Sequence, residues 1–154
     1  MSELATLGLA RAHEADQIAR MSRDLIEAGL TWAWTPDRVR RHILDRSCSV
    51  VVARSDQRVV AFALMHFGDE IAHLNLLAVD PQWRRQYCGR RLMEWLLASA
   101  EVAGIKRIDL ELRADNAAAK SFYESVGFAA TTIKPRYYQG VESALGMRLT
   151  LLKD

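Results

Sequence analysis

Four arginines surround a single glycine in the stretch RRQYCGRRL, residues 84–92. The stretch follows an apolar run that ends at Val79 and precedes a segment with helical periodicity. The first turn of a helix presents unpaired N–H groups and a partial positive charge, and Gly89 allows close approach of the backbone to a ligand. Guanidinium groups match phosphate oxygens, and the stretch supplies Arg84, Arg85, Arg90 and Arg91. These residues alone predict either a site for a pyrophosphate-bearing ligand or a solvated basic turn.

Other chemistries have little support in the sequence. It contains no Walker lysine motif and no GxGxxG, which argues against nucleotide hydrolysis and dinucleotide binding. A formal net charge of +2 makes a nucleic-acid partner unexpected. Cys48 and Cys88 form no CxxC pair and the histidines are scattered, so we expect no metal site. The sequence shows no secretory signal and no membrane-spanning apolar run, so we expect a cytoplasmic protein without a membrane partner.

The surrounding pattern mixes helices and strands. Periodicity predicts helices at 13–28, 37–45, 92–103 and 115–127. It predicts strands at 5–10, 49–53, 59–67, 71–79, 107–113, 128–133 and 144–151. Half of the 154 residues are hydrophobic, which is enough for one domain over residues 1–154. The expected class is α/β or α+β, with one central sheet covered by helices.

Two segments resemble the core of the GCN5-related N-acetyltransferase (GNAT) family: LLAVDPQWRRQYCGRRLMEWLLASA and LELRADNAAAKSFYESVGF. The family's loop pattern is Q/R-x-x-G-x-G/A, in which Arg84 fills the first position and Gly89 the last. Tyr87 stands where the family usually has its first glycine, and a positive φ there would cost roughly 1 kcal/mol or more. The resemblance implies acetyl-CoA as cosubstrate and a mixed, mostly antiparallel sheet of about six to seven strands flanked by about four helices.

The resemblance also implies the coenzyme contacts, which follow the strand end, the loop and two helix starts. They are Leu77, Ala78, Val79, Arg84, Arg85, Gln86, Tyr87, Cys88, Gly89, Arg90, Arg91, Asn116, Ala119 and Tyr123. The backbones of Leu77 and Val79 correspond to the family's contacts with the pantetheine arm, and the Leu77 amide is a candidate oxyanion donor. Asn116 alone predicts a helix N-cap.

Acetyl transfer to an amine requires a deprotonated nitrogen, a stabilised oxyanion and a protonated leaving thiolate. By resemblance, Glu111 in LELR is the first candidate base and His73 the second. An ion-paired strand carboxylate and a structural histidine are the alternative readings. Tyr123 matches the family's general acid, with an ordinary core aromatic as the alternative.

The segment RYYQGVESALGM resembles the ribosomal-protein alanine N-acetyltransferase subgroup. The acceptor contacts it suggests are Trp32, Trp34, Tyr137, Tyr138 and Glu142; a turn with two ordinary aromatics and a packed tryptophan loop remain alternatives. The arginines of the second helix, such as Arg38, are assigned to its solvated face.

The expected function is acetyl-CoA-dependent transfer of an acetyl group directly to a primary amine, with a protein or peptide N-terminal α-amine preferred. A small amine acceptor and a non-catalytic acetyl-CoA-binding regulatory module are the alternatives, and a ribosome- or RNA-binding module ranks last. The oligomeric state is open, with a homodimer among the options.

Overall fold

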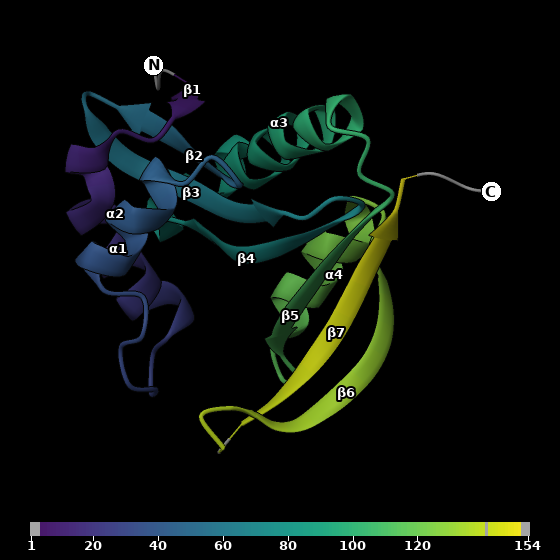
Figure 1. Ribbon diagram of the computed structural model, residues 1–154. Coiled ribbons are helices and arrows are strands. Elements are labelled where there is room, and N and C mark those ends of the chain that lie inside the picture. The colour runs from purple at the N-terminus through teal and green to yellow at the C-terminus, as the bar shows by residue number, and fades with distance from the viewer. Residues whose placement is uncertain (1–3, 141, 152–154) are drawn as a thin grey trace.

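The computed structural model describes residues 4–140 and 142–151, without the side chains of Arg85 and Gln86. Seven strands form one sheet in the order β1-β2-β3-β4-β5-β7-β6 (Figure 1). Their bounds are β1 Thr6–Leu9, β2 Cys48–Ser55, β3 Arg58–Phe67, β4 Ile71–Val79, β5 Arg107–Arg113, β6 Ala129–Tyr138 and β7 Glu142–Thr150. Within the described ranges β4 and β5 pair in parallel, and the other neighbours pair antiparallel. The predicted mixed, mostly antiparallel sheet is confirmed.

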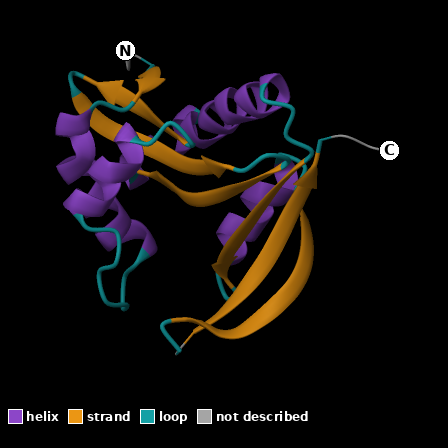
Figure 2. Ribbon diagram, in the orientation of Figure 1, coloured by secondary structure: helices purple, strands orange, loops and turns teal. Residues whose placement is uncertain are grey.

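Four α-helices cover the sheet on both faces (Figure 2). They are α1 Ala15–Met21, α2 Pro36–Leu44, α3 Cys88–Val102 and α4 Ala117–Ser125. On one face, α1 and α2 bury Ile18 and Val39 against Phe62 of β3. On the other face, Leu92 of α3 and Tyr123 of α4 belong to the same core as Leu110 of β5. Burial of these apolar side chains is the main force that holds the layers together.

The neighbouring strands β4 and β5 separate about halfway along their length. Among the described residues, the pairing joins Ile71–Leu74 of β4 to Arg107–Leu110 of β5 and ends there. On β4 the pairing with β3 passes from Leu74 to Leu76, so Asn75 is an extra residue in a β-bulge. Leu74 consequently packs in the core below α3, whereas Leu76 packs in the core below α1 and α2. Beyond the bulge the two strands leave an open end in the sheet between them.

Two predicted elements differ from the observed ones. The expected helix 13–28 consists of a 3₁₀ turn Ala12–Glu14, α1, and a π-helical turn Ser22–Ile26, after which Gly29 has a φ of +83°. Strand β6 continues to Tyr138, past the expected end at residue 133, so the tyrosine pair lies on a strand instead of in a loop. The irregular pairing of β6 with β7, which shifts register twice, hides this continuation from a period-two pattern.

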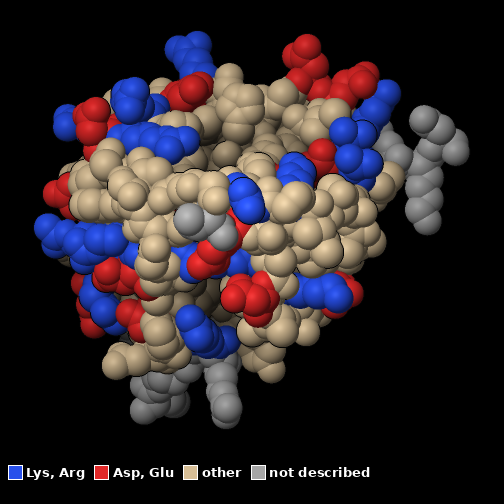
Figure 3. All heavy atoms as spheres, turned by 90° about the horizontal axis from the view of Figure 1, so that it is seen from below, with Lys and Arg blue, Asp and Glu red and all other residues tan. Residues whose placement is uncertain are grey.

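The described part of the chain contains no helix that is long and apolar enough to cross a membrane. In the same ranges, no group of three or more His, Cys, Asp or Glu side chains could hold a metal ion. Seen from below, Lys and Arg side chains alternate with Asp and Glu on the surface (Figure 3). This face therefore carries no field of a single sign.

Candidate active site

The arginine-rich loop leads directly into α3. A 3₁₀ turn, Pro81–Gln86, begins after Asp80, whose carboxylate accepts a hydrogen bond of 2.9 Å from the Gln82 amide. Tyr87 then adopts φ +59° and ψ +21°, and α3 begins at Cys88. The strain that the sequence made conditional on a positive φ is therefore present at Tyr87. The tyrosine side chain is 71% exposed.

A cavity of about 490 Å³, the loop cavity, lies between the end of β4, the start of α3 and α4. Ten of the predicted coenzyme residues line it: Leu77, Ala78, Val79, Arg84, Tyr87, Gly89, Arg90, Asn116, Ala119 and Tyr123. Asn116 is also the N-cap that its sequence predicts, because its Oδ1 accepts a hydrogen bond of 3.0 Å from the Ala119 amide. The loop cavity thus combines backbone at the start of α3 with two arginine side chains.

Two predicted coenzyme residues whose side chains are described, Cys88 and Arg91, do not line this cavity. Cys88 is buried in the core, and burial raises the pKa of its thiol, which argues against a reactive thiolate. The Arg91 guanidinium instead donates a hydrogen bond of 2.8 Å to the carbonyl of Ala5. The side chains of Arg85 and Gln86 lie outside the described residues.

A second cavity of about 720 Å³, the cleft cavity, occupies the opening between β4 and β5. Its walls come from the loop before α2, from β4 and β5, and from the end of β6. The loop cavity and the cleft cavity share part of their lining: Leu25, Leu77, Asn116, Ala119 and Tyr123. A ligand in one cavity therefore lies next to a ligand in the other.

Tyr123 stands at the junction of the two cavities. Its ring packs edge-on against Phe122 and Phe128, with centroid separations of 5.2 and 5.5 Å. The residue is only 8% exposed, and burial raises the pKa of its hydroxyl. Tyr123 is therefore both a core aromatic and a residue of the site, because the same side chain packs in the core and lines the two cavities.

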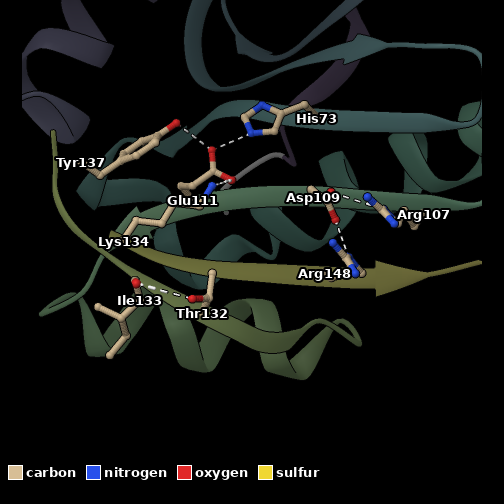
Figure 4. A network of polar contacts seen from close by, with 9 residues as sticks. All are labelled: His73, Arg107, Asp109, Glu111, Thr132, Ile133, Lys134, Tyr137 and Arg148. Atoms are coloured by element: carbon tan, nitrogen blue, oxygen red, sulfur yellow. Dashed lines mark hydrogen bonds and ion pairs between the residues drawn. The ribbon is translucent and has the colours of Figure 1, made fainter. Parts of the chain in front are cut away.

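Glu111 of β5 and His73 of β4 form a close pair near the point where the pairing of these two strands ends (Figure 4). His73 Nε2 lies 2.8 Å from Glu111 Oε1, and the Tyr137 hydroxyl donates to the same oxygen at 2.9 Å. Lys134 Nζ lies 3.6 Å from Oε2. The hydrogen bond with His73 is the main cause that lowers the pKa of Glu111 to about 2, and the same contact raises the pKa of His73. The pair therefore favours a carboxylate beside an imidazolium.

Behind the pair lies a second group of charges. His73 is opposite Asp109 in the strand pairing, and Arg148 Nε donates a hydrogen bond of 2.8 Å to Asp109. Arg107 Nε lies 3.4 Å from the other oxygen of Asp109. Glu111 lines the cleft cavity and His73 does not, so His73 is placed to act through Glu111.

The predicted acceptor residues divide into two groups. Trp34, Tyr137 and Tyr138 line the cleft cavity. Trp32 instead packs against the core under α1, where its indole N–H donates to the Ala19 carbonyl at 3.2 Å. Glu142 lies 3.5 Å from Arg113 in an ion pair and does not line the cavity.

Three further cavity residues were not predicted from the sequence. Arg38 is not simply on the solvated face of α2, because its guanidinium carbon lies 3.8 Å from the centre of the Trp34 ring and the residue lines the cleft cavity. Their separation by four residues across a helix start is the signal that could have identified this pair. Glu27 accepts hydrogen bonds from the Ala33 and Trp34 amides, at 2.7 and 3.2 Å, and from a serine hydroxyl. Gln139 bonds to a loop 108 positions away, a contact with no local signal.

The family model of the acetyltransferase (GNAT) family matches residues 16–128 of the chain. The [ribosomal protein bS18]-alanine N-acetyltransferase of Salmonella typhimurium is 42% identical over 100 residues, which are 63% of this chain and 68% of that relative. The crystal structure of the ribosomal-protein-S18-alanine N-acetyltransferase from Escherichia coli matches with a TM-score of 0.82 at 28% identity, over 98% of this chain and 96% of that one. Ard1 from Thermoplasma volcanium matches with a TM-score of 0.85 at 25% identity, over 98% and 100%.

The family model spans most of the chain, and it includes the arginine-rich loop, the strand bearing Glu111 and the helix bearing Tyr123. The matched relatives are N-acetyltransferases, and the solved structures share the fold over nearly the whole chain. The chain therefore belongs to the acetyltransferase (GNAT) family and is an N-acetyltransferase that uses acetyl-CoA as its cosubstrate.

Proposed function

We propose that the acceptor of this enzyme is the α-amine at the N-terminus of a protein or peptide. The observation that carries the proposal is the cleft cavity, which opens beside the loop cavity and is bordered by Glu111, Tyr137 and Tyr138. A relative whose name specifies an alanine of ribosomal protein bS18 as acceptor supports a protein acceptor. An α-amine has a pKa of about 7.7–8.0, so a strong base is not needed to obtain its neutral form.

In this proposal the coenzyme occupies the loop cavity. Amides at the start of α3 and the guanidinium groups of Arg84 and Arg90 suit the pyrophosphate. Gly89 suits close packing there, since a Cβ at this position would meet the Phe122 ring at 3.2 Å. The backbone of Leu77 to Val79, at the end of β4, is then available to the pantetheine arm, with the Leu77 amide as oxyanion donor.

The amine enters from the cleft cavity and meets Glu111. A carboxylate with a pKa of about 2 holds an ammonium well but takes its proton poorly. His73, whose pKa is raised by that carboxylate, is the more basic member of the pair. We therefore assign the proton acceptor to the coupled Glu111–His73 pair in its state with a neutral imidazole, with Glu111 in contact with the amine.

The proposed general acid is Tyr123, which protonates the leaving thiolate. Its place on the lining of both cavities is the supporting observation. Burial raises the pKa of its hydroxyl, so the hydroxyl keeps its proton at neutral pH and is available to donate it toward the developing thiolate. The transfer is direct and requires no covalent enzyme intermediate.

The test measures thiol release from acetyl-CoA with a panel of N-terminal peptides, lysine-containing peptides with blocked N-termini, and small amines. We expect one free N-terminal peptide to exceed every other acceptor in kcat/KM. Glu111→Gln and Tyr123→Phe should each lower kcat by about 10²-fold or more and leave acetyl-CoA binding within about twofold by calorimetry.

Glu101→Gln, at an exposed position near the end of α3, is the matched control and should behave as wild type. A small amine that exceeded all peptides would overturn the choice of acceptor. Tight acetyl-CoA binding without turnover of any acceptor would favour the regulatory-module alternative.

The proposal includes a cytoplasmic location for the enzyme, which is consistent with a protein N-terminus as acceptor. The single-domain extent over residues 1–154 and a homodimer stay predictions, to be tested by limited proteolysis and by light scattering of the purified chain. A dimer whose interface included the cleft cavity would exclude a protein acceptor from it.

A further inference from the structure

Asn75 occupies the bulge in β4, where the strand leaves its partner β5. Asn75 lines the cleft cavity, together with Glu111 and Leu77. The Oδ1 atom is buried, and no donor among the described residues forms a hydrogen bond with it. Asn75 thus borders the acceptor side of the site and carries a buried oxygen that lacks a hydrogen-bond partner among the described residues.

A buried carbonyl oxygen without a donor costs desolvation energy, and native proteins contain few such atoms. A leucine of similar size at this position would avoid the cost. The bulge residue lies at the open end of the sheet and lines the cleft cavity, where the proposed acceptor binds. A donor on the ligand would satisfy the buried oxygen.

The neighbouring carboxylate cannot satisfy all the N–H groups of an amine. Glu111 Oε1 already receives hydrogen bonds from His73 and Tyr137, and Oε2 lies near Lys134 (Figure 4). A primary amine that points its lone pair at the thioester carbon has two N–H bonds directed elsewhere. One of them can reach the Glu111 carboxylate, and the second needs another oxygen.

We propose that Asn75 Oδ1 accepts a hydrogen bond from the attacking amine and orients its lone pair toward the acetyl group. The inference rests on the proposed function, because it assumes that the acceptor amine enters the cleft cavity. An amide oxygen takes up no proton at neutral pH. Asn75 therefore holds the amine without stabilising its unreactive ammonium form, as a second carboxylate would.

A role limited to supporting His73 is the competing reading, since the Asn75 side chain also favours the charged imidazole. The two readings differ in what removal of the oxygen does to the free enzyme. If Asn75 supports the fold, its removal should lower the stability of the free enzyme. If its oxygen has no partner there, removal should not lower the stability. Substitution by an apolar residue should then leave the thermal stability unchanged or increase it.

The experiment compares Asn75→Leu and Asn75→Asp with wild type, using the best primary amine that wild type acetylates. For Asn75→Leu we expect the KM of the acceptor to rise about tenfold, while the KM of acetyl-CoA stays within twofold and Tm does not fall. Asn75→Asp restores an oxygen acceptor and should recover acceptor binding, but it should shift the kcat/KM profile to higher pH because it favours the ammonium. Asn75→Ala repeats the test without a bulky side chain.

An unchanged acceptor KM in Asn75→Leu and Asn75→Ala would overturn the inference and leave the proposed function intact. A raised KM accompanied by a clear loss of Tm would assign Asn75 to structure instead. Failure of wild type to acetylate any primary amine would overturn both the proposed function and the role of Asn75.

Discussion

The Gln139 side chain forms two hydrogen bonds with the backbone of Thr31. The Thr31 amide donates to Gln139 Oε1 at 2.8 Å, and Gln139 Nε2 donates to the Thr31 carbonyl at 2.7 Å. This reciprocal pair joins the loop before α2 to the turn after β6, and both segments line the cleft cavity. The Gln139 side chain therefore links two segments, distant in the sequence, that form the wall on the acceptor side of the site.

Substitution Gln139→Glu should loosen this wall, because the Nε2 donor is lost and a carboxylate faces the Thr31 carbonyl. We expect the KM of the acceptor to rise about fivefold, with kcat and the KM of acetyl-CoA within twofold of wild type. Steady-state kinetics with each substrate varied in turn provides the measurement. Gln57→Glu, in the turn between β2 and β3, is the control and should leave all three constants unchanged. An equal rise in both KM values would contradict a role confined to the acceptor side.

The His73–Glu111 pair makes stability depend on pH. The pKa of His73 is raised above 6.5, so its contribution is complete below pH 6.5 and is lost as pH rises through the folded-state pKa. The pKa of Glu111 falls from 4.5 to about 2, so its contribution is present above pH 4.5 and is lost as pH falls toward 2. Both contributions are therefore complete only between about pH 4.5 and 6.5.

The variant His73→Gln should lower Tm most within that window, by an amount that corresponds to about 1 kcal/mol or less, since 36% of the imidazole is exposed. Thermal unfolding from pH 4 to 9 provides the measurement. The control is His66→Gln, at the exposed position opposite His73 in the pairing of β3 with β4. Its Tm curve should run parallel to that of wild type. A His73→Gln curve that also ran parallel would show that the pair does not contribute in this way.

Tyr87 carries a backbone strain that glycine would relieve. Its φ of +59° costs an L-residue about 1–2 kcal/mol, while its exposed side chain contributes little packing. After allowance for the greater freedom of glycine in the unfolded chain, Tyr87→Gly should raise the free energy of unfolding by up to about 1 kcal/mol. Urea unfolding provides the measurement. Tyr87→Ala keeps the Cβ and should bring no such gain; equal gains from both variants would place the effect in the side chain.

Gly89 is required by a close approach between the start of α3 and α4. A Cβ at this position would lie 3.2 Å from two atoms of the Phe122 ring and 3.7 Å from Val79 Cγ2. Gly89→Ala should therefore destabilise the protein by about 1–3 kcal/mol and weaken acetyl-CoA binding, because the start of α3 must shift. Calorimetry and urea unfolding check both effects. The double variant with Phe122→Leu should recover part of the stability, and strict additivity of the two changes would count against this contact.

The local elements were largely predictable because they depend on short-range patterns. A continuous apolar run marks β3, alternating apolar residues mark β5, and a 3.6-residue period marks α3. The loop motif with Gly89 and the segment containing Glu111 and Tyr123 were sufficient to indicate the family, since their residue types and order lie within two short stretches. Even the strain at Tyr87 was foreseen, because it follows from one residue type at one position of the motif.

The tertiary structure decided which of these residues meet. Arg91 turns to the carbonyl of Ala5, and Trp32 turns to the core, although residue type alone suited both for a ligand. Asn75 and Gln139 reach the cleft cavity through a bulge in strand pairing and through a contact between distant loops. A bulge shifts every later side chain on its strand to the other face, and a contact over 108 positions leaves no periodic trace in the chain. Residue type and local period therefore specify the chemistry available to this protein, while long-range pairing specifies which groups act together.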